Sequence, residues 1–273
     1  MLGAIAGDII GKPYEFHNIK TTDFPLFSEK SRFSDDTVMT IAVAQGLRQG
    51  LGDPEASRVA VIDALHAYGA WYPRAGYGGR FGQWLEENER EPYNSWGNGS
   101  AMRVSAAAWL YDDLTTVEQY AEISAAVTHN HPEGIKGAQA VAAAIFLART
   151  GADKAQIQTY ITSRYGYDLD FTLDTIRPTY TFDVSCQGSV PQAIRAFLEG
   201  TGFENAVRLA VSIGGDSDTI AAITGSIAEA YHGDVPPDIA EETLQRLNRR
   251  LREQVLEFRA LFAHKRRICH NGV

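Results

Sequence analysis

The chain has 273 residues, of which 44% are hydrophobic and 22% are charged, a composition typical of a globular protein with a substantial core. Lys and Arg number 25 against 34 Asp and Glu, so the net charge is -9, which argues against broad attraction to nucleic acids or anionic membranes. The two cysteines, Cys186 and Cys269, form neither a disulfide framework nor a cysteine-based metal motif.

The sequence shows no sign of export or membrane insertion. Residues 1–6 carry no positive charge and Asp8 interrupts the apolar run, so no secretory signal is expected. The longest uncharged apolar stretch, residues 137–148, is too short to cross a bilayer. We therefore expect one domain over residues 1–273, monomeric and cytoplasmic, whose partner is a small ligand or a protein.

Apolar residues recur at helical spacing in nearly every segment, and hardly any segment alternates as a strand does, which predicts an all-α fold. Gly11 and Pro13 end the first predicted helix and leave Glu15 in a loop. Asp53 and Pro54 provide an N-cap and a first helical residue for a later helix.

Further along the chain, Thr115 and Glu118 form a capping-box pattern. After His131-Pro132, the alanine-rich stretch to Arg149 is apolar on most sides, as a central helix is. Other helices are predicted at residues 189–198, 203–211 and 219–231, and one C-terminal helix carries the stripe Leu244, Leu247, Leu251, Val255, Phe258 and Phe262. Residues 72–82, 93–99 and 167–188 are expected to be irregular.

Two short acidic clusters are the strongest indication of function. They are Ser34-Asp35-Asp36-Thr37 and Gly214-Gly215-Asp216-Ser217-Asp218-Thr219, each at the start of an apolar helical stretch. Either cluster alone is more typical of a helix cap or an Asx turn. Four carboxylates brought together would repel one another unless a cation neutralised them. With neighbouring hydroxyls they offer the hard oxygen ligands that Mg²⁺, Mn²⁺ or Ca²⁺ prefer, so we predict that the chain brings both clusters together around metal.

Three other segments are weaker candidates. The turn Gly97-Asn98-Gly99-Ser100 precedes a helix containing Met102, and its N–H groups either bind phosphate or form an ordinary turn and cap. His129 at a helix start is more typical of a structural histidine than of a metal ligand. Glu15 taken alone is typical of a solvated loop residue.

The order and context of these motifs resemble the ADP-ribosylglycohydrolase family, which includes hydrolases of ADP-ribosyl-arginine and ADP-ribosyl-serine. The resemblance covers almost the whole chain, through residues 3–8, 34–37, 97–103, 128–129 and 214–219. It implies a compact, all-α domain of orthogonal helices with two Mg²⁺ ions, or Mn²⁺, in a central cleft. By that analogy the metal ligands are Ser34, Asp35, Asp36, Asp216, Asp218 and Thr219, with Glu15 at the edge of the site.

The implied reaction is hydrolysis of the C1″ bond, glycosidic or ester, that joins ADP-ribose to a protein side chain or a small acceptor. Two metal ions would hold the ribose hydroxyls and activate a water, and Glu15 or a metal-bound aspartate, Asp35 or Asp36, would be the base. Nearby carboxylates would stabilise an oxocarbenium-like transition state. The substrate would contact Gly97, Asn98, Gly99, Ser100 and Met102, with His129 and Tyr77 lining the ribose or nucleotide pocket.

The chain departs from some family members at one place. They carry a catalytic acidic residue shortly before the Gly-Asn-Gly turn, where this chain has Asn94-Ser95-Trp96. A mechanism using an aspartate there is therefore not supported, and neither is an arginine-linked substrate. Nothing in the sequence chooses among links to arginine, serine, an acetyl group or a nucleobase.

Two alternatives come from other classes. A helical prenyl-diphosphate enzyme also binds Mg²⁺ through aspartate clusters, but Val38-Met39-Thr40 offers no second carboxylate three residues after the Asp-Asp pair. A non-catalytic ADP-ribose binder or crystallin-like structural protein of the same fold would have no reason to keep mutually repelling carboxylates at both clusters.

Overall fold

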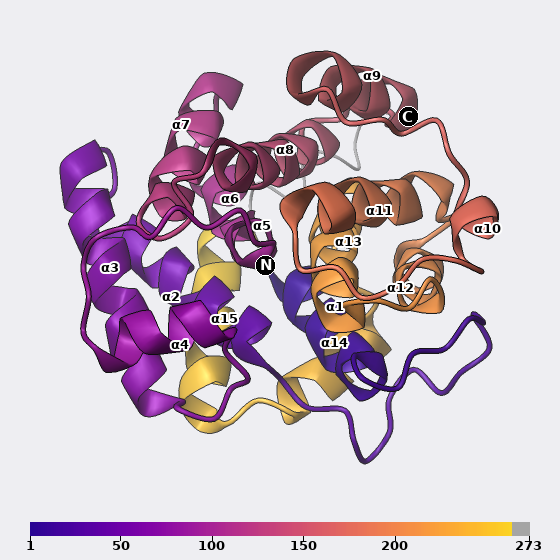
Figure 1. Cartoon of the computed structure of the whole chain (residues 1–273), viewed down its shortest axis with the longest axis horizontal. Coiled ribbons are helices and arrows are strands. Elements are labelled where there is room, and N and C mark those ends of the chain that lie inside the picture. The colour runs from indigo at the N-terminus through magenta and orange to yellow at the C-terminus, as the bar shows by residue number, and fades with distance from the viewer. Residues whose placement is uncertain (264–273) are drawn as a thin grey trace.

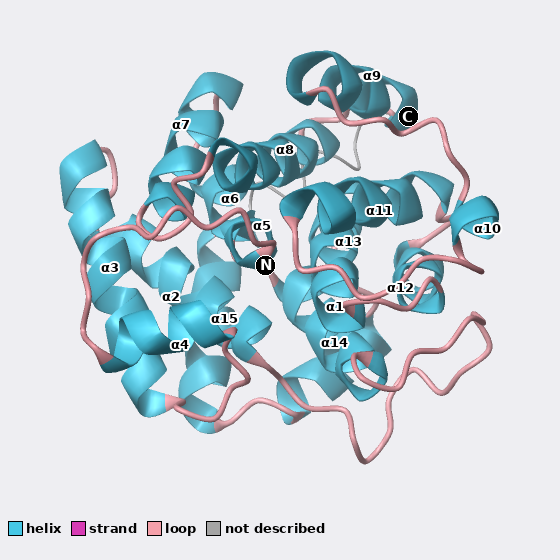
Figure 2. Ribbon diagram, viewed as in Figure 1, coloured by secondary structure: helices cyan, strands magenta, loops and turns pink. Residues whose placement is uncertain are grey.

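The computed structural model describes residues 1–263, and within that range the chain forms helices and no strand, apart from one isolated bridge between Gly97 and Ser185 (Figure 2). The all-α prediction is confirmed, whereas Cys269 lies outside the described residues. The longer helices are α1 (Leu2–Gly11), α2 (Asp35–Gln49), α3 (Pro54–Trp71), α4 (Gly79–Glu86), α7 (Leu114–Ala126), α8 (Pro132–Arg149), α9 (Lys154–Tyr165), α11 (Cys186–Glu199), α12 (Phe203–Ser212), α13 (Ser217–His232), α14 (Pro237–Gln245) and α15 (Arg249–Leu261).

The remaining elements are short. They are the 3₁₀ turns η1 (Lys12–Tyr14) and η2 (Val104–Ala106) and the single-turn helices α5 (Gly99–Met102), α6 (Ala107–Leu110) and α10 (Leu173–Ile176). None of the described helices combines the length and hydropathy that a membrane span requires.

Helix α13 lies at the centre of the fold (Figure 1). Every residue from Ser217 to Ala230 is buried, because α1, α8, α11 and α12 pack around it. Its small residues, including Ala221 and Gly225, allow these neighbours to approach closely. The alanine-rich α8 is largely buried against it, which confirms the prediction of a central helix there.

Three glycines bring α1 against α13. They are spaced four residues apart and therefore lie on one face of α1. A Cβ added at any of them would lie between 2.0 and 2.5 Å from a carbonyl oxygen of α13, the pairs being Gly3 with Gly225, Gly7 with Ala221 and Gly11 with Ser217. Because α1 carries Asp8 and α13 carries Asp218, this contact also sets the separation of the two carboxylates.

The C-terminal apolar stripe forms two helices, so the prediction of one is wrong. Leu244 belongs to α14, which ends at Gln245, and three residues separate it from α15, which starts at Arg249. Asn248 is the N-cap of α15, and its side-chain oxygen accepts a hydrogen bond from the backbone N–H of Leu251. Asparagine is among the best N-cap residues, and it lies within the stripe that periodicity had treated as continuous.

The predicted capping box in α7 is also wrong. Asp113 is the N-cap and accepts a hydrogen bond from the backbone N–H of Thr116. Glu118 is buried and accepts hydrogen bonds from the hydroxyls of Tyr160 and Tyr165. Aspartate and threonine are both good N-caps, and the tertiary contact of Glu118 with α9 was not visible in the local pattern.

The segments expected to be irregular contain more helix than predicted. Residues 72–82 include the start of α4, and residues 167–188 include α10 and the first turn of α11, which begins at Cys186 rather than Ser189. Ser185 caps α11 by accepting a hydrogen bond from the backbone N–H of Gly188. Hydroxyl caps of this kind are weak signals in a sequence rich in Ser and Thr.

We expect Gly7→Ala to lower the free energy of unfolding by about 3 kcal/mol, the upper end for overpacking. The added Cβ would lie 2.0 Å from the carbonyl oxygen of Ala221, so α1 and α13 would have to separate. Gly202→Ala is the control, since its Cβ meets no atom within 4 Å. Urea denaturation measures both variants, and equal losses would contradict the close contact.

Candidate active site

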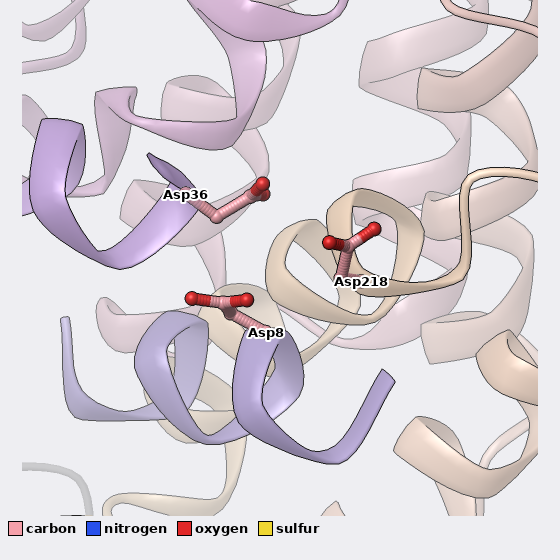
Figure 3. Close-up of side chains that lie close together, drawn as sticks. All are labelled: Asp8, Asp36 and Asp218. Atoms are coloured by element: carbon pink, nitrogen blue, oxygen red, sulfur yellow. The ribbon is translucent and has the colours of Figure 1, made fainter. Parts of the chain in front are cut away.

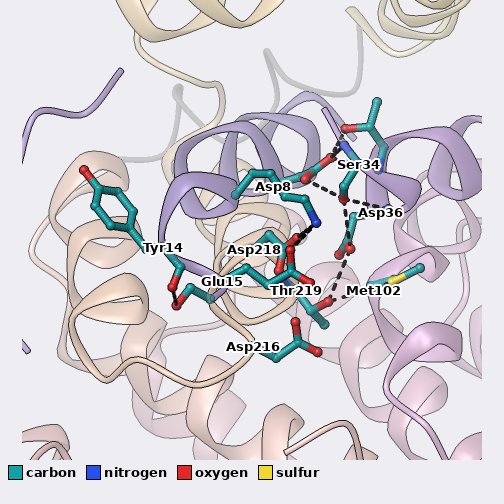
Figure 4. Close-up of polar contacts among 12 residues, drawn as sticks. Asp8, Tyr14, Glu15, Ser34, Asp36, Met102, Asp216, Asp218 and Thr219 are labelled. Carbon is teal, nitrogen blue, oxygen red and sulfur yellow. Dashed lines mark hydrogen bonds and ion pairs between the residues drawn. The ribbon is translucent and has the colours of Figure 1, made fainter. Parts of the chain in front are cut away.

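Asp8 holds the N-terminus of α2 against α1 (Figure 4). Its Oδ2 accepts hydrogen bonds from the backbone N–H groups of Ser34 and Thr37 at 2.9 and 3.1 Å. Its Oδ1 accepts a 2.7 Å hydrogen bond from the Ser34 hydroxyl, whose oxygen in turn caps the N–H of Asp36. The helix cap of which the first acidic cluster alone is typical is therefore made by Ser34 together with Asp8.

Asp8 was missed as a candidate residue by the sequence analysis. The available signal was a fully buried carboxylate in the middle of an apolar helix, since aspartate is almost never buried without a partner. Its partners come from residues 34–37, far along the chain, so only the folded structure identifies them.

The second acidic cluster is positioned by a tight turn before α13. Gly214 and Gly215 have φ angles of +71° and +74°, in the left-handed region where glycine is favoured. The side chain of Asn18 holds this turn by accepting from the N–H of Gly215 and donating to its carbonyl oxygen, at 2.7 and 3.0 Å. As a result Asp216 becomes the N-cap residue and Asp218 lies in the first turn of α13.

The two acidic clusters meet. Figure 3 shows the carboxylates of Asp8, Asp36 and Asp218 pointing toward one another from α1, α2 and α13. One oxygen from each lies within 4.8 Å of the others, and Glu15, Asp216 and Asp218 form a second such group. The groups share Asp218. The Thr219 hydroxyl of the second acidic cluster donates to Asp36 Oδ2 of the first at 3.2 Å.

The chemistry of the cluster fits a hard divalent cation. Neither group contains histidine or cysteine among the residues that the structure describes, and oxygen ligands favour Mg²⁺, Mn²⁺ or Ca²⁺ over zinc and copper. Asp36 Oδ1 is buried and has no hydrogen-bond partner. A buried acceptor without a partner carries a desolvation penalty that a bound cation would remove.

Burial and mutual repulsion disturb the ionisation of the cluster. Burial, followed by the charge of Asp218, raises the pKa of Asp8 to about 6. The same two causes, in the same order, raise the pKa values of Asp35, Asp36 and Asp216 well above the usual range. The cluster is therefore short of positive charge at neutral pH.

Lys12 supplies one positive charge to the cluster. Its ammonium donates to Asp218 Oδ2 at 2.8 Å and to Glu15. Burial alone lowers the pKa of Lys12, but Asp218 and Glu15 raise it above the ordinary value, so the ammonium stays charged.

The carboxylates line a cavity of about 510 Å³, within the range of small-molecule sites. Glu15, Asp35, Asp36, Asp216, Asp218 and Thr219 contribute to the lining. Among the predicted substrate-binding residues, Tyr77, Gly97, Asn98, Gly99, Met102 and His129 also line it, whereas Ser100 does not. Ser34, which was predicted as a metal ligand, does not line it either. Ser100 is buried, and its hydroxyl donates to the carbonyl oxygen of Gly134.

The glycine-rich turn supports a carboxylate as well as lining the cavity. The Asn98 side-chain amide donates to Asp216 Oδ2 at 2.7 Å and to the Ser189 hydroxyl at 3.0 Å. The N–H group of Gly97 donates to Ser95 Oγ, and that of Asn98 donates to the Val184 carbonyl oxygen. Since α5 has only four residues, the turn lacks the long helix dipole expected of a phosphate site.

His129 is a neutral part of the cavity wall. Burial, followed by the Arg103 charge, lowers its pKa well below the usual value. The Thr128 hydroxyl oxygen accepts a hydrogen bond from Arg103 and lies within hydrogen-bond distance, 2.7 Å, of His129 Nδ1. His129 Nε2 lies 3.2 Å from a Cβ placed on Gly99.

The fold and this cavity define an all-α protein whose carboxylates form a site suited to a hard cation. The sequence model of the ADP-ribosylglycohydrolase family matches residues 1–268, and the chain belongs to this family. The resemblance seen in the motifs is confirmed, and the prenyl-diphosphate alternative is wrong.

Several characterised and solved proteins are similar to the chain. ADP-ribosylhydrolase ARH3 of Homo sapiens is 27% identical over 313 residues, covering 85% of this chain and 84% of the relative. ADP-ribosylarginine hydrolase Tri1 of Pseudomonas putida is 27% identical over 186 residues, covering 62% and 50%. A solved ADP-ribosylglycohydrolase-related protein complex has a TM-score of 0.65 and 25% identity, covering 98% of this chain and 97% of that one.

The stabilisation of the protein by Mg²⁺ is expected to grow with pH. A raised carboxyl pKa, such as about 6 for Asp8, means that the folded state keeps a proton that the unfolded state has lost. The stability that this proton contributes is present below the unfolded pKa, about 3.9, and is lost as pH rises through the folded pKa. Mg²⁺ displaces such protons, so its effect is larger at pH 8 than at pH 5.

Thermal melting with EDTA or saturating Mg²⁺ tests this at pH 5 and 8. We expect Mg²⁺ to raise Tm by about 5 °C at pH 8 and by less than half of that at pH 5. At each pH, the Tm measured with EDTA is subtracted from the Tm measured with Mg²⁺. This subtraction removes the pH effect of His129, which is opposite in sign because its pKa is lowered. An equal rise in Tm at both pH values would contradict the raised carboxyl pKa values.

Proposed function

We propose that the chain is a Mg²⁺-dependent hydrolase that cleaves the C1″ bond joining ADP-ribose to a protein side chain or a small acceptor. The observation that carries this proposal is the convergence of carboxylates from α1, α2 and α13 in one cluster beside a cavity, with a buried Asp36 oxygen left unpaired, in a member of the ADP-ribosylglycohydrolase family. The relatives that the chain resembles are named as hydrolases of ADP-ribosyl groups.

Two groups of carboxylates support a pair of cation positions. Asp8, Asp36 and Asp218 would hold one ion, and Glu15, Asp216 and Asp218 the other. When bound, Mg²⁺ polarises the scissile bond and lowers the pKa of a water. Thr219 and Asp35 are close enough to the cavity to complete these sites, whereas the Ser34 hydroxyl donates to Asp8, an arrangement that suits a supporting role.

Glu15 is the best placed general base. Its side chain is 12% exposed and lines the cavity, so it can reach both the solvent and a bound substrate. Burial, followed by the charge of Asp218, raises its pKa, which strengthens it as a proton acceptor. Asp35 and Asp36, which also line the cavity, remain the alternatives.

The rest of the cavity suits a nucleotide sugar. Tyr77, Phe81 and Tyr93 provide apolar walls, and Arg103 contributes a buried guanidinium whose pKa, lowered to about 10 by burial, still leaves it charged at neutral pH. A diphosphate entering a site lined by carboxylates needs compensating cations, which supports metal dependence.

The structure leaves the leaving group open. The segment before the Gly-Asn-Gly turn carries no carboxylate, and its Asn94 has a φ of +55° with its N–H bonded to the Asn130 side chain. Links to arginine, serine, an acetyl group or a nucleobase all remain candidates. The cytoplasmic location and the monomeric state also remain predictions.

A panel of ADP-ribosylated arginine, serine and nucleobase together with O-acetyl-ADP-ribose, assayed with Mg²⁺ or EDTA, tests the activity. We expect at least one substrate to be hydrolysed only with Mg²⁺, and Asp36→Asn to reduce its kcat by more than about 100-fold, since even outer-shell partners of a metal contribute 10–100-fold. Asp63→Asn, which removes a half-exposed carboxylate paired with Arg90, is the matched control.

Two outcomes would contradict the proposal. Full activity of a folded Asp36→Asn variant would remove the carboxylate cluster from the mechanism. Tight ADP-ribose binding in calorimetry without turnover of any substrate would instead favour the non-catalytic binder.

A further inference from the structure

Lys12 occupies one side of the carboxylate cluster. It is the first residue of η1, directly after α1, and only 11% of its side chain is exposed. Its ammonium bonds to Glu15 and Asp218, which are two of the three residues in the second candidate cation group. Figure 4 shows Glu15 and Asp218 side by side on this flank of the cluster.

The two candidate cation positions therefore differ. In the Asp8, Asp36 and Asp218 group, Asp36 Oδ1 is buried and unpaired. In the other group, Asp218 Oδ2 and Glu15 already accept hydrogen bonds from an ammonium ion. Asp218 Oδ1 accepts from the backbone N–H of Thr219, so both oxygens of the shared carboxylate have partners before any ion binds.

The loop that contains Gly76 lies against both the Lys12 ammonium and the Asp35 carboxylate. A Cβ added at Gly76 would lie 3.5 Å from Asp35 Oδ1 and 3.7 Å from Lys12 Nζ, so these two groups lie under the same glycine. On its other side the ammonium is 6.0 Å from the ring centre of Phe16. Lys12 is thus enclosed within the site, although it does not line the cavity.

We propose that Lys12 is a tethered counter-cation that neutralises the Glu15 side of the cluster in the metal-free protein and competes with a divalent ion for that position. A divalent ion that binds Glu15 and Asp218 has to displace the ammonium, because two cations bound to the same two carboxylates repel each other at contact distance. The ion at Asp8 and Asp36 shares only Asp218 with the ammonium, so it meets less of this competition. The chain consequently has one high-affinity and one low-affinity cation position.

This inference rests on the proposed metal-dependent function and adds a consequence for its regulation. Glu15 is the proposed base, and its bond to Lys12 ties its carboxylate to the ammonium. Binding of the second ion releases Glu15 from Lys12. The concentration of divalent ion would then set how much of the protein has both cation positions filled.

Titration of the metal-free protein with Mn²⁺, with free Mn²⁺ measured by electron paramagnetic resonance, tests the proposal without using activity. The wild type should bind two ions with clearly different Kd values. Lys12→Met, which keeps the aliphatic stem and removes the charge, should lower the Kd of the weaker position at least about tenfold. The Kd of the tighter position should change less than about threefold.

Three further variants distinguish the effect of the Lys12 charge on Mn²⁺ binding from effects of side-chain shape and of folding. Lys12→Arg keeps the charge and should retain the weak second position. Lys136→Met is the matched control, because it removes another half-buried ammonium paired three residues away with a glutamate, Glu133, outside the cluster. Lys12→Gln replaces Lys12→Met if thermal melting shows that the methionine variant does not fold.

An unchanged or higher Kd for the weaker position in folded Lys12→Met and Lys12→Gln variants would overturn the proposal, as would two equally tight positions in the wild type. If neither the wild type nor any variant bound Mn²⁺, both the metal site and the proposal would be refuted. If Lys12→Met lowered the Kd of the weaker position as predicted but the protein hydrolysed no ADP-ribosylated substrate, the counter-cation role of Lys12 would stand and the proposed function would be refuted.

Discussion

The close contact between α1 and α13 is the constraint on which the site depends. Glycines at positions 3, 7 and 11 bring the two backbones together, and this places the Asp8 carboxylate beside that of Asp218. Asp8 then binds the N-terminus of α2 through Ser34 and Thr37. The packing of two helix backbones therefore determines how closely Asp8, Asp36 and Asp218 approach one another.

The carboxylate cluster is an electrostatically unfavourable arrangement. Buried carboxylates this close repel one another, which is why the pKa values of Asp8, Asp35, Asp36 and Asp216 are all raised. The protein offsets part of this cost with hydrogen bonds to Asp8 and with the ammonium of Lys12. The remaining deficit of positive charge is a driving force for cation binding. The adjacent cavity has room for a small molecule next to a bound cation.

Most helices were predictable because their signals are local. Proline at the first position of α3 and α8 and the apolar periodicity of α13 depend on a few neighbouring residues. The errors arose where local signals were ambiguous. Asn248 interrupts an apolar stripe and caps a second helix there. Asp113 competes with Thr115 for the cap of α7, because both are good caps within reach of the same helix start.

The sequence by itself determined the all-α class, the two acidic clusters and the oxygen-only character of their ligands, because residue type and helical period do not depend on the fold. It also carried the order of motifs by which the chain belongs to the ADP-ribosylglycohydrolase family. Only the tertiary structure showed that Asp8 completes the cluster, that Asn98 supports Asp216, and that Lys12 bonds to Glu15 and Asp218. Except for the local bond between Lys12 and Glu15, these contacts join residues far apart in the chain, and their distances are set by helix packing rather than by spacing along the sequence.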